Sequence, residues 1–404
     1  MAGTFANNKG NRRRFLESSA GAAAGMMSLG SARRSSSSPN QKVQIAVIGV
    51  RARGRQLVKR IAAHPHATVT ALCDIDSAQI NRASSELQDL QPYSARLERD
   101  YRKVLAAGDI DAVVVATPDH WHAPMCLDAL AANKHVFVET PISHTIDETA
   151  AIVSAASNSD RIVHCGMQQR SMPHMHSAIH ELRNGSIGSI RLARAWASHR
   201  RKPIGKAVDG PPPIDVDYDT WLGAATKRPF NPNRFHYSWR WFWDYGGGEL
   251  TNWGVHMIDI AMRGLSASSR DGSQFANPTI STTGGKYYFN DDQETPDTLT
   301  ASFDFGDRSL IWEHRQWCPR QIEGRSAGVA FYGDGGTLIV DRGGWKIYDS
   351  SEKVAATDNS RGDTIIEDFV DAIRSGSGPQ QDLASIASST DLCHRANLVY
   401  RGLL

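Results

Sequence analysis

The chain has 404 residues, which is too long for one small hydrophobic core and indicates two domains. Its 45 Lys and Arg residues nearly balance its 43 Asp and Glu residues, for a net charge of +2, and no basic block occurs beyond the first 34 positions. We therefore expect no nucleic-acid partner and no membrane partner. The five cysteines form no C-x-x-C pair, which argues against a zinc knuckle and a disulfide framework.

The first 40 residues are expected to direct export and to join the fold through a linker. Residues 11–17 (Asn-Arg-Arg-Arg-Phe-Leu-Glu) are similar to the twin-arginine export consensus, and a mildly apolar run and the small residues Gly30-Ser31-Ala32 follow. Residues 35–41 form a serine-rich linker. The sequence therefore predicts a twin-arginine signal peptide and a periplasmic or secreted protein, with a disordered basic N-terminus as the alternative.

A nucleotide-binding turn is predicted directly after this linker. Residues 43–49 are mostly β-branched and apolar, as in a strand buried on both faces, and a helical period starts near Arg53. A strand that leads into a helix N-terminus binds anions such as a pyrophosphate. The turn from Gly49 to Gly54 keeps the outer glycines of G-x-G-x-x-G but has Arg51 at the middle one. Arg51 adds bulk there, although its guanidinium could fold onto a phosphate, and an ordinary strand-to-helix turn is the alternative.

An acid follows the second predicted strand. Residues 68–73 end at Asp74, which lies 25 positions after Gly49. A carboxylate at that distance accepts from the 2′-hydroxyl of the adenine ribose and repels a 2′-phosphate, which favours NAD. Arg51 and Arg53 nearby keep NADP possible. The other interpretation of Asp74 is an acid at the N-terminus of the helix predicted over 77–90.

Strands and helices continue to alternate up to residue 165. The alternation predicts a doubly wound parallel sheet in a first domain of residues 41–165. Ligands of such sheets bind at the carboxyl ends of the strands. Residues that follow strand ends are therefore predicted to bind the cofactor, and these are Gly49, Asp74, Thr117, Pro118 and Glu139.

From residue 166 onward, alternating runs separated by hairpin-sized spacers replace the buried ones. They predict a second α/β domain, residues 166–404, with an open and largely antiparallel sheet. A long proline-rich loop is predicted over 199–219. Amphipathic helices over 363–374 and 383–400 are expected to pack back between the domains. His176 and His180 are four residues apart on a predicted helix, but no third ligand is evident, so no metal site is predicted.

The segment from Trp239 to Asp259 is the most unusual part of the sequence. It holds four tryptophans and three consecutive glycines within 21 residues. Aromatic faces stack on sugars, and glycines let a ligand approach the backbone. Asn252 and His256 are four residues apart, so a regular helix would place them on one face. An aromatic core cluster beside a capped helix is the alternative interpretation.

Together these segments resemble the glucose–fructose oxidoreductase/inositol dehydrogenase family, called Gfo/Idh/MocA. The resemblance covers residues 42–404 and rests on VIGVRARGR, CDID, ATPDHWH, HVFVETP and GGGELTNWGVHMID. It implies a Rossmann domain before an α/β domain with an open antiparallel sheet, a tightly held NAD(P), and a sugar or cyclitol substrate. It also implies that His122 lies near the nicotinamide ribose and that the second sheet forms a homo-oligomer.

The resemblance implies a catalytic Lys in E-K-P and an Asp and a His in D-x-x-x-H. Here Thr140 replaces the lysine and Asn252 replaces the aspartate, so only His256 keeps an ionisable group. Losing a positioned acid or base costs about 10²–10⁴-fold in rate. His256 could carry the proton alone, with Thr140 as a polar positioner and Asn252 holding the other side of the ring.

Three functional hypotheses follow. The first is an NAD(P)-dependent oxidoreductase acting on a sugar, a cyclitol or a sugar derivative. The second is similar to the family's NAD-dependent glycosidases, which oxidise a ring carbon transiently, eliminate the aglycone and reduce the ring again. The third is a sugar-binding protein without catalysis. Release of NADH would indicate the first hypothesis. Hydrolysis of a glycoside without net formation of NADH would indicate the second, and sugar binding without turnover would indicate the third.

Overall fold

The computed structural model describes residues 42–268, 277–376 and 381–404. The predicted signal peptide and the linker lie outside the described residues. Within the described ranges, no helix is both long and apolar enough to cross a membrane.

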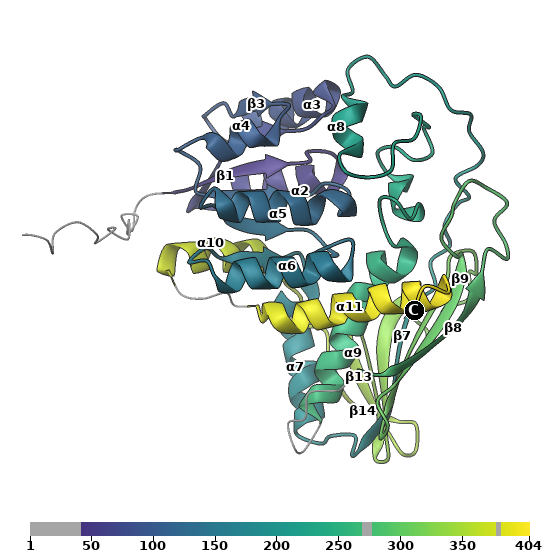
Figure 1. Ribbon diagram of the computed structural model, residues 1–404. Helices are drawn as coiled ribbons and strands as arrows, with labels where there is room; N and C mark the ends of the chain where they lie inside the picture. The colour runs from purple at the N-terminus through teal and green to yellow at the C-terminus, as the bar shows by residue number, and fades with distance from the viewer. Residues whose placement is uncertain (1–41, 269–276, 377–380) are drawn as a thin grey trace, which may run out of the picture. The chain divides into compact units, whose positions relative to one another are not determined.

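The first sheet holds six parallel strands (Figure 1). Their order in the sheet is β3-β2-β1-β4-β5-β6, which is the doubly wound order that the alternation predicted. The central strand β1 is almost completely buried, as its run of β-branched residues requires. The strands are β1 (Val43–Ile48), β2 (Ala67–Cys73), β3 (Arg96–Glu98), β4 (Ala112–Val115), β5 (His135–Val138) and β6 (Val163–Cys165).

Helices connect these strands and cover the sheet (Figure 1). Two of them begin with an Asx cap in which Asp76 or Asp100 accepts from a backbone N–H, and α6 begins with a capping box formed by Thr145 and Glu148. The helices are α2 (Ala52–Ala62), α3 (Ser77–Gln88), α4 (Tyr101–Ala106), α5 (His122–Ala131) and α6 (Ile146–Ser157).

The second sheet has eight strands in the order β14-β13-β12-β11-β7-β10-β9-β8. All neighbours pair antiparallel except β7 and β10, which confirms a largely antiparallel sheet. The sequence analysis missed β3, β13 and β14. The strands are β7 (Ile190–Ala197), β8 (Thr279–Gly285), β9 (Thr298–Asp304), β10 (Ser309–Arg315), β11 (Ala327–Gly333), β12 (Gly336–Asp341), β13 (Gly344–Asp349) and β14 (Val354–Asp358).

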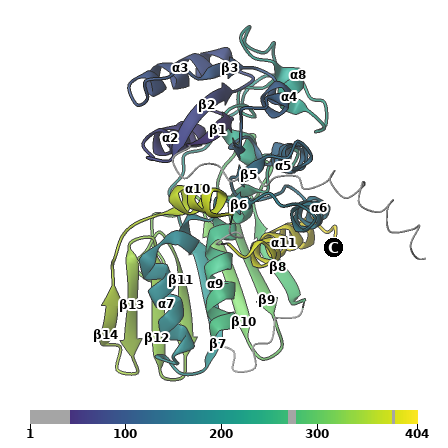
Figure 2. The same ribbon diagram turned by 90° about the vertical axis from the view of Figure 1, so that its left-hand side faces the viewer.

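Helices α7 (Pro173–Arg183), α9 (Val255–Ala267) and α11 (Leu383–Tyr400) lie along one face of this sheet (Figure 2). Helix α11 also contacts α6 of the first domain, and α10 (Ile365–Ser375) contacts α2 and β1. The last helices thus connect the two sheets. The chain between β7 and α9 contains the short helix α8 (Tyr218–Leu222) and packs through its own aromatic cluster, in which Trp221, Phe235 and Tyr245 are buried.

Candidate active site

A cavity of about 540 Å³ opens where the strands of the first sheet end and where the segment before α9 approaches them. Eleven of the twelve site residues predicted from the sequence line it, although they come from both halves of the chain. The exception is Gly54. The lining residues among the predictions are Gly49, Arg51, Arg53, Asp74, Thr117, Pro118, His122, Glu139, Thr140, Asn252 and His256.

The turn after β1 explains both outer glycines of the motif. Gly49 has φ +85°, and a Cβ there would lie 2.6 Å from the carbonyl oxygen of Ala116. A Cβ on Gly54 would lie 1.8 Å from the carbonyl oxygen of Gly49, so a side chain at 54 cannot coexist with this turn. Gly54 therefore acts through close packing rather than by facing the cavity.

Arg51 does not fill the space in front of the helix. It is the N-cap residue of α2, and its Nη1 donates to the carbonyl oxygen of His236, 3.2 Å away. The guanidinium thus leans toward the other half of the chain. No side chain caps the α2 N-terminus and no acid lies in its first turn, so its N–H groups can meet an anion.

Asp74 stands at the end of β2 beside this turn. Its Oδ2 accepts from the backbone N–H of Val50 at 2.9 Å, and its Oδ1 accepts from the N–H of Asp76 at 3.1 Å. Burial raises the pKa of Asp74 to about 6, although the backbone N–H groups of Val50, Asp76 and Ile75 oppose the rise. A carboxylate can accept further hydrogen bonds, which the hydroxyls of a ribose can donate. The alternative role at a helix N-terminus belongs to Asp76, which caps α3.

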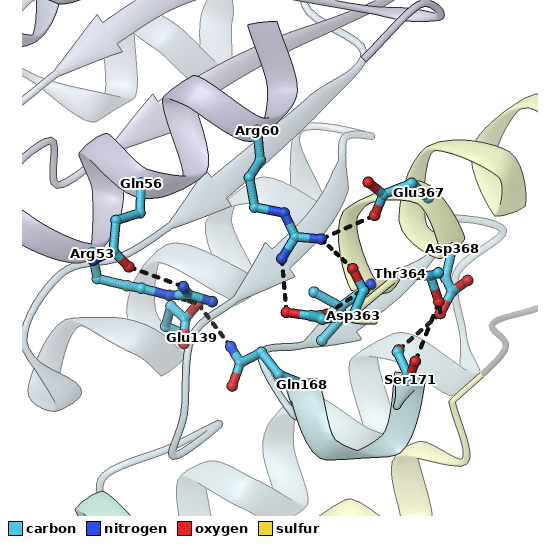
Figure 3. Close-up of polar contacts among 11 residues, drawn as sticks. Arg53, Gln56, Arg60, Glu139, Gln168, Ser171, Asp363, Thr364, Glu367 and Asp368 are labelled. Carbon is cyan, nitrogen blue, oxygen red and sulfur yellow. Dashed lines mark hydrogen bonds and ion pairs between the residues drawn. The ribbon is translucent and has the colours of Figure 1, made fainter. Parts of the chain in front are cut away.

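Arg53 and Glu139 form an ion pair on the cavity wall (Figure 3). Nε of Arg53 donates to Oε1 of Glu139 at 2.7 Å, and Nε2 of Gln168 approaches the same oxygen at 3.4 Å. Gly166 makes room for this carboxylate, because a Cβ there would lie 2.5 Å from Oε2. The Glu of the E-x-P motif is therefore held by an arginine, and one guanidinium nitrogen of Arg53, Nη2, is buried without a partner in the described part of the chain.

His122 braces the backbone around the site. Its Nδ1 lies 2.6 Å from the carbonyl oxygen of Pro141, and its Nε2 lies 3.0 Å from that of Thr117. Burial lowers the pKa of His122. Both ring nitrogens face backbone carbonyls, and a neutral ring can donate to only one of them. The hydroxyl of Thr117, in contrast, is buried with no partner among the described residues.

His256 and Thr140 meet across the cavity. Nε2 of His256 lies 3.2 Å from Oγ1 of Thr140, although the two residues are 116 positions apart. The imidazole is buried, with 7% of its surface exposed. Burial, followed by the charges of Arg342 and Arg53, lowers the pKa of His256 well below its ordinary value, so the ring is neutral at pH 7. Its Nδ1 has no partner in the described ranges.

The expected contact between Asn252 and His256 is not formed. Residues Leu250–Gly254 form a π-helical turn, η4, immediately before α9. A π turn is wider than an α turn, so residues four apart no longer share one face. Nδ2 of Asn252 points instead toward Oε2 of Glu249, 3.5 Å away. The side of the imidazole that Asn252 was expected to hold is therefore open.

Glu249 precedes this turn and holds it through an ion pair, and the sequence analysis missed this residue. Its side chain is fully buried and accepts from Nε and Nη2 of Arg201 at 3.0 and 2.8 Å. Burial alone would raise the pKa of Glu249, but Arg201 and His199 lower it to about 2. Only its place in the glycine-rich segment hinted at a role, because a lone Glu carries no pattern.

The four tryptophans of the unusual segment divide between the two interpretations. Trp239 and Trp253 line the cavity, as the sugar-stacking hypothesis requires. Trp241 is buried in the aromatic cluster, and Trp243 packs on Tyr400. Further lining residues were not singled out from the sequence, namely Trp121, Gln168, Trp221, His236, Arg240, Arg342 and Asp363.

Comparison with known proteins matches both halves of the chain to one family. Residues 43–167 match the oxidoreductase family's NAD-binding Rossmann fold, and residues 202–267 match its C-terminal alpha/beta domain. The chain belongs to the Gfo/Idh/MocA family. Its first domain is therefore an NAD-binding domain, which confirms the predicted cofactor, and the family is one of enzymes.

Three similar proteins illustrate the range of this family. A glycosyl hydrolase family 109 protein of Saccharopolyspora erythraea is 37% identical over 131 residues, which are 31% of this chain and only 28% of that protein. The uncharacterized oxidoreductase YrbE of Bacillus subtilis is 24% identical over 305 residues, 74% of each chain. The structure of GenD2 from gentamicin A biosynthesis, solved with NAD, shares the fold with a TM-score of 0.65 at 18% identity, covering 91% of this chain and 95% of that one.

The residues of the cavity fit NAD. Three buried polar atoms on its lining residues have no partner in the part of the chain that the structure describes, and they are Thr117 Oγ1, Arg53 Nη2 and His256 Nδ1. The open N-terminus of α2 suits the pyrophosphate, and Asp74 suits the adenine ribose. The cavity thus offers polar partners to the pyrophosphate and to the adenine ribose of NAD.

Proposed function

We propose that this protein is an NAD-dependent oxidoreductase that acts on a hydroxyl-bearing carbon of a sugar, a cyclitol or a sugar derivative. The observation that carries the proposal is the contact of His256 with Thr140, 3.2 Å long, inside the cavity that the nucleotide-binding strand ends also line. It combines a neutral base and a hydroxyl relay at a place where site residues of the two domains meet.

NAD supplies the acceptor for the two electrons and the hydrogen that leave the carbon. His256 takes the proton of the substrate hydroxyl, because its ring is neutral at pH 7. Thr140 can donate to Nε2 while it accepts from the substrate, so its hydroxyl can pass the proton on. Arg53 and Arg342, whose charges act on His256, also favour the negative charge that develops on the substrate oxygen. These cations compensate in part for the missing lysine.

The cavity wall supports a sugar or cyclitol substrate. Trp239 and Trp253 offer aromatic faces, and the guanidinium carbon of Arg240 lies 4.6 Å from the ring centre of Trp239. Asp74 favours NAD over NADP, because an ionised carboxylate repels a 2′-phosphate. Among the described residues no group of three or more metal-ligating side chains is present, so the proposal uses no metal.

The test is oxidation of a panel of sugars and cyclitols by the full chain with NAD, followed by NADH absorbance. We expect NADH formation that His256→Ala abolishes and that Thr140→Ser retains, since serine keeps the hydroxyl. Thr140→Val, of similar shape, should lower the rate. Equal rates for wild type and His256→Ala would overturn the assignment of the base.

A second candidate is a glycosidase that uses NAD without consuming it. It is favoured by the relative named as a glycosyl hydrolase family 109 protein, although this chain spans about a quarter of that protein. Release of nitrophenol from a nitrophenyl glycoside without accumulation of NADH would support this candidate over the first. Sugar binding without either product would leave the non-catalytic hypothesis.

We further propose that the chain is exported by the twin-arginine route to the periplasm or beyond. The proposal rests on residues 11–17 and the small residues at 30–32. Cell fractionation of the tagged full chain should place it outside the cytoplasm, and replacing Arg12 and Arg13 by Lys should retain it inside. Cytoplasmic location of the unaltered chain would refute the proposal.

We also propose a homo-oligomer that forms through the second sheet. The partly exposed Tyr332 and Tyr348 support it, because they belong with the buried Trp196 to a small apolar cluster, whereas Ala195 and Ala197 on either side of Trp196 pack in the main core. Light scattering after size-exclusion chromatography should show a dimer or larger. Replacing the half-buried Tyr348 of that cluster by Glu should yield monomers, and an unchanged mass would count against this interface.

A further inference from the structure

Arg342 lies in the turn between β12 and β13 and lines the cavity. Its guanidinium carbon lies 4.6 Å from the ring centre of Trp253. His199 also lies against this tryptophan, with its ring centre 4.4 Å away. Arg342 is thus positioned by stacking on an aromatic ring, which holds the guanidinium in place without neutralising it.

The carboxylates near Arg342 are each bound to a different arginine. Figure 3 shows that Asp363 is held by Arg60 and Glu139 by Arg53. The N···O distances in the three pairs are 2.8 Å for Asp363 with Arg60, 2.7 Å for Glu139 with Arg53, and 2.5 Å for Asp341 with Arg325. Among the described residues, Arg342 has neither an ion pair nor a hydrogen bond.

The charge of Arg342 reaches the reacting position. Burial is the largest cause of the lowered pKa of His256. The charge of Arg342 is the second largest cause, and the charge of Arg53 is the third. The charges of two guanidinium groups therefore act on the base, and of the two only Arg53 has a carboxylate partner among the described residues. Arg342 is exposed in the protein without ligand. When a ligand displaces the water around this side chain, its charge is costly to desolvate unless an anion pairs with it. Such an anion can come from the ligand.

We propose that the substrate is an acidic sugar or cyclitol derivative whose carboxylate pairs with Arg342 while a neighbouring hydroxyl reacts at His256. The planar guanidinium matches a carboxylate in a bidentate arrangement. This inference rests on the proposed function and narrows its substrate class. It assigns to Arg342 the selection of charged over neutral ligands.

The test compares ligands that differ by one charge. Calorimetry and thermal shift would measure binding of glucuronate against glucose, and of galacturonate against galactose, to the NAD-saturated full chain. The methyl esters serve as isosteric neutral ligands. We expect at least one acid to bind more than tenfold tighter than its sugar and its ester. Glucose 6-phosphate tests whether a phosphate, rather than a carboxylate, is the preferred anion.

Variants then assign the effect to one side chain. Arg342→Ala should weaken the binding of acids by about 10- to 100-fold, in line with hydrogen bonds to a charged partner, and should weaken the binding of neutral sugars much less. Arg342→Lys should recover part of the loss. The exposed Arg320, which does not line the cavity, provides the matched control, Arg320→Ala.

Three results would overturn the inference. They are acids that bind no better than their neutral partners, acid binding that survives Arg342→Ala, and a phosphate that binds where carboxylates do not. If the protein still binds NAD and forms NADH from neutral sugars, the proposed function stands and only the charge requirement falls. If NAD itself does not bind in the calorimeter, the proposed function falls as well.

Discussion

NAD affinity should depend on pH through Asp74. Burial raises the pKa of this carboxyl to about 6 in the protein without nucleotide. Roughly 90% of it is then ionised at pH 7 and roughly 10% at pH 5. Because the ribose hydroxyls need an ionised acceptor, we expect the Kd for NAD to rise about tenfold between these two pH values.

The loss of NAD affinity on substitution of Asp74 can be calculated from the hydrogen bonds of its side chain. Asp74→Asn keeps an oxygen for the N–H of Val50, 2.9 Å away in the wild type, but removes the charge. A hydrogen bond to a charged group is worth about 1 kcal/mol more than a neutral one, so two ribose hydroxyls lose about 2 kcal/mol. This corresponds to an affinity about 30-fold lower at pH 8.

Calorimetric titration of NAD into the full chain at half-unit steps from pH 5 to pH 8 provides the measurement. The Asp74→Asn variant should bind more weakly and with the same Kd across the range. A wild-type Kd that does not change from pH 5 to pH 8, or a variant that retains the slope, would refute the assignment of Asp74 to the ribose.

Three further predictions concern the other half of the cavity. Since the pKa of His256 is lowered well below 6.5, kcat/KM should stay level through pH 6.5 and fall only at lower pH; a pH–rate profile with its acid limb at or above 6.5 would contradict this. Thr140→Lys combined with Asn252→Asp should raise any NADH-forming rate, measured by absorbance, and an unchanged rate would favour the glycosidase or the non-catalytic hypothesis. Glu249→Gln, which leaves Arg201 unpaired, should cost roughly 3–5 kcal/mol in urea unfolding at pH 7. The difference from wild type should shrink as pH falls from about 4.5 toward 2, because the low pKa of Glu249 stabilises the fold only while it is ionised.

Much of the fold could be predicted because the buried strands and their turns are local signals. Helix α11 has the predicted bounds, and every strand of the first sheet was found except β3. Strand β3 has three residues, and β14 alternates too weakly and is too exposed to show a pattern. The parallel pairing of β7 with β10 joins strands more than 100 residues apart, which no local pattern reveals.

The site could be predicted where position along a strand decides it, and not where backbone detail does. Asp74 and Glu139 were found because both follow buried strands. The four-residue spacing of Asn252 and His256 suggested a regular α-helix, but the structure has a π turn at this point, which separates the two side chains. Arg342 lies on a hairpin turn whose sequence carries no signature, and only tertiary packing brings it to the cavity.

Helix α10 has a consequence for how the protein is made. Its residues Ile365, Ile366, Phe369 and Val370 are buried in the core under β1 and α2, and the ring centre of Phe369 lies 5.6 Å from that of Phe137. In a nascent chain that ends after β6, the hydrophobic surface of β1 and α2 that α10 covers would be exposed to water. The nucleotide-binding half therefore completes its core only after nearly the whole polypeptide has left the ribosome, and a fragment ending at residue 167 should aggregate rather than bind nucleotide.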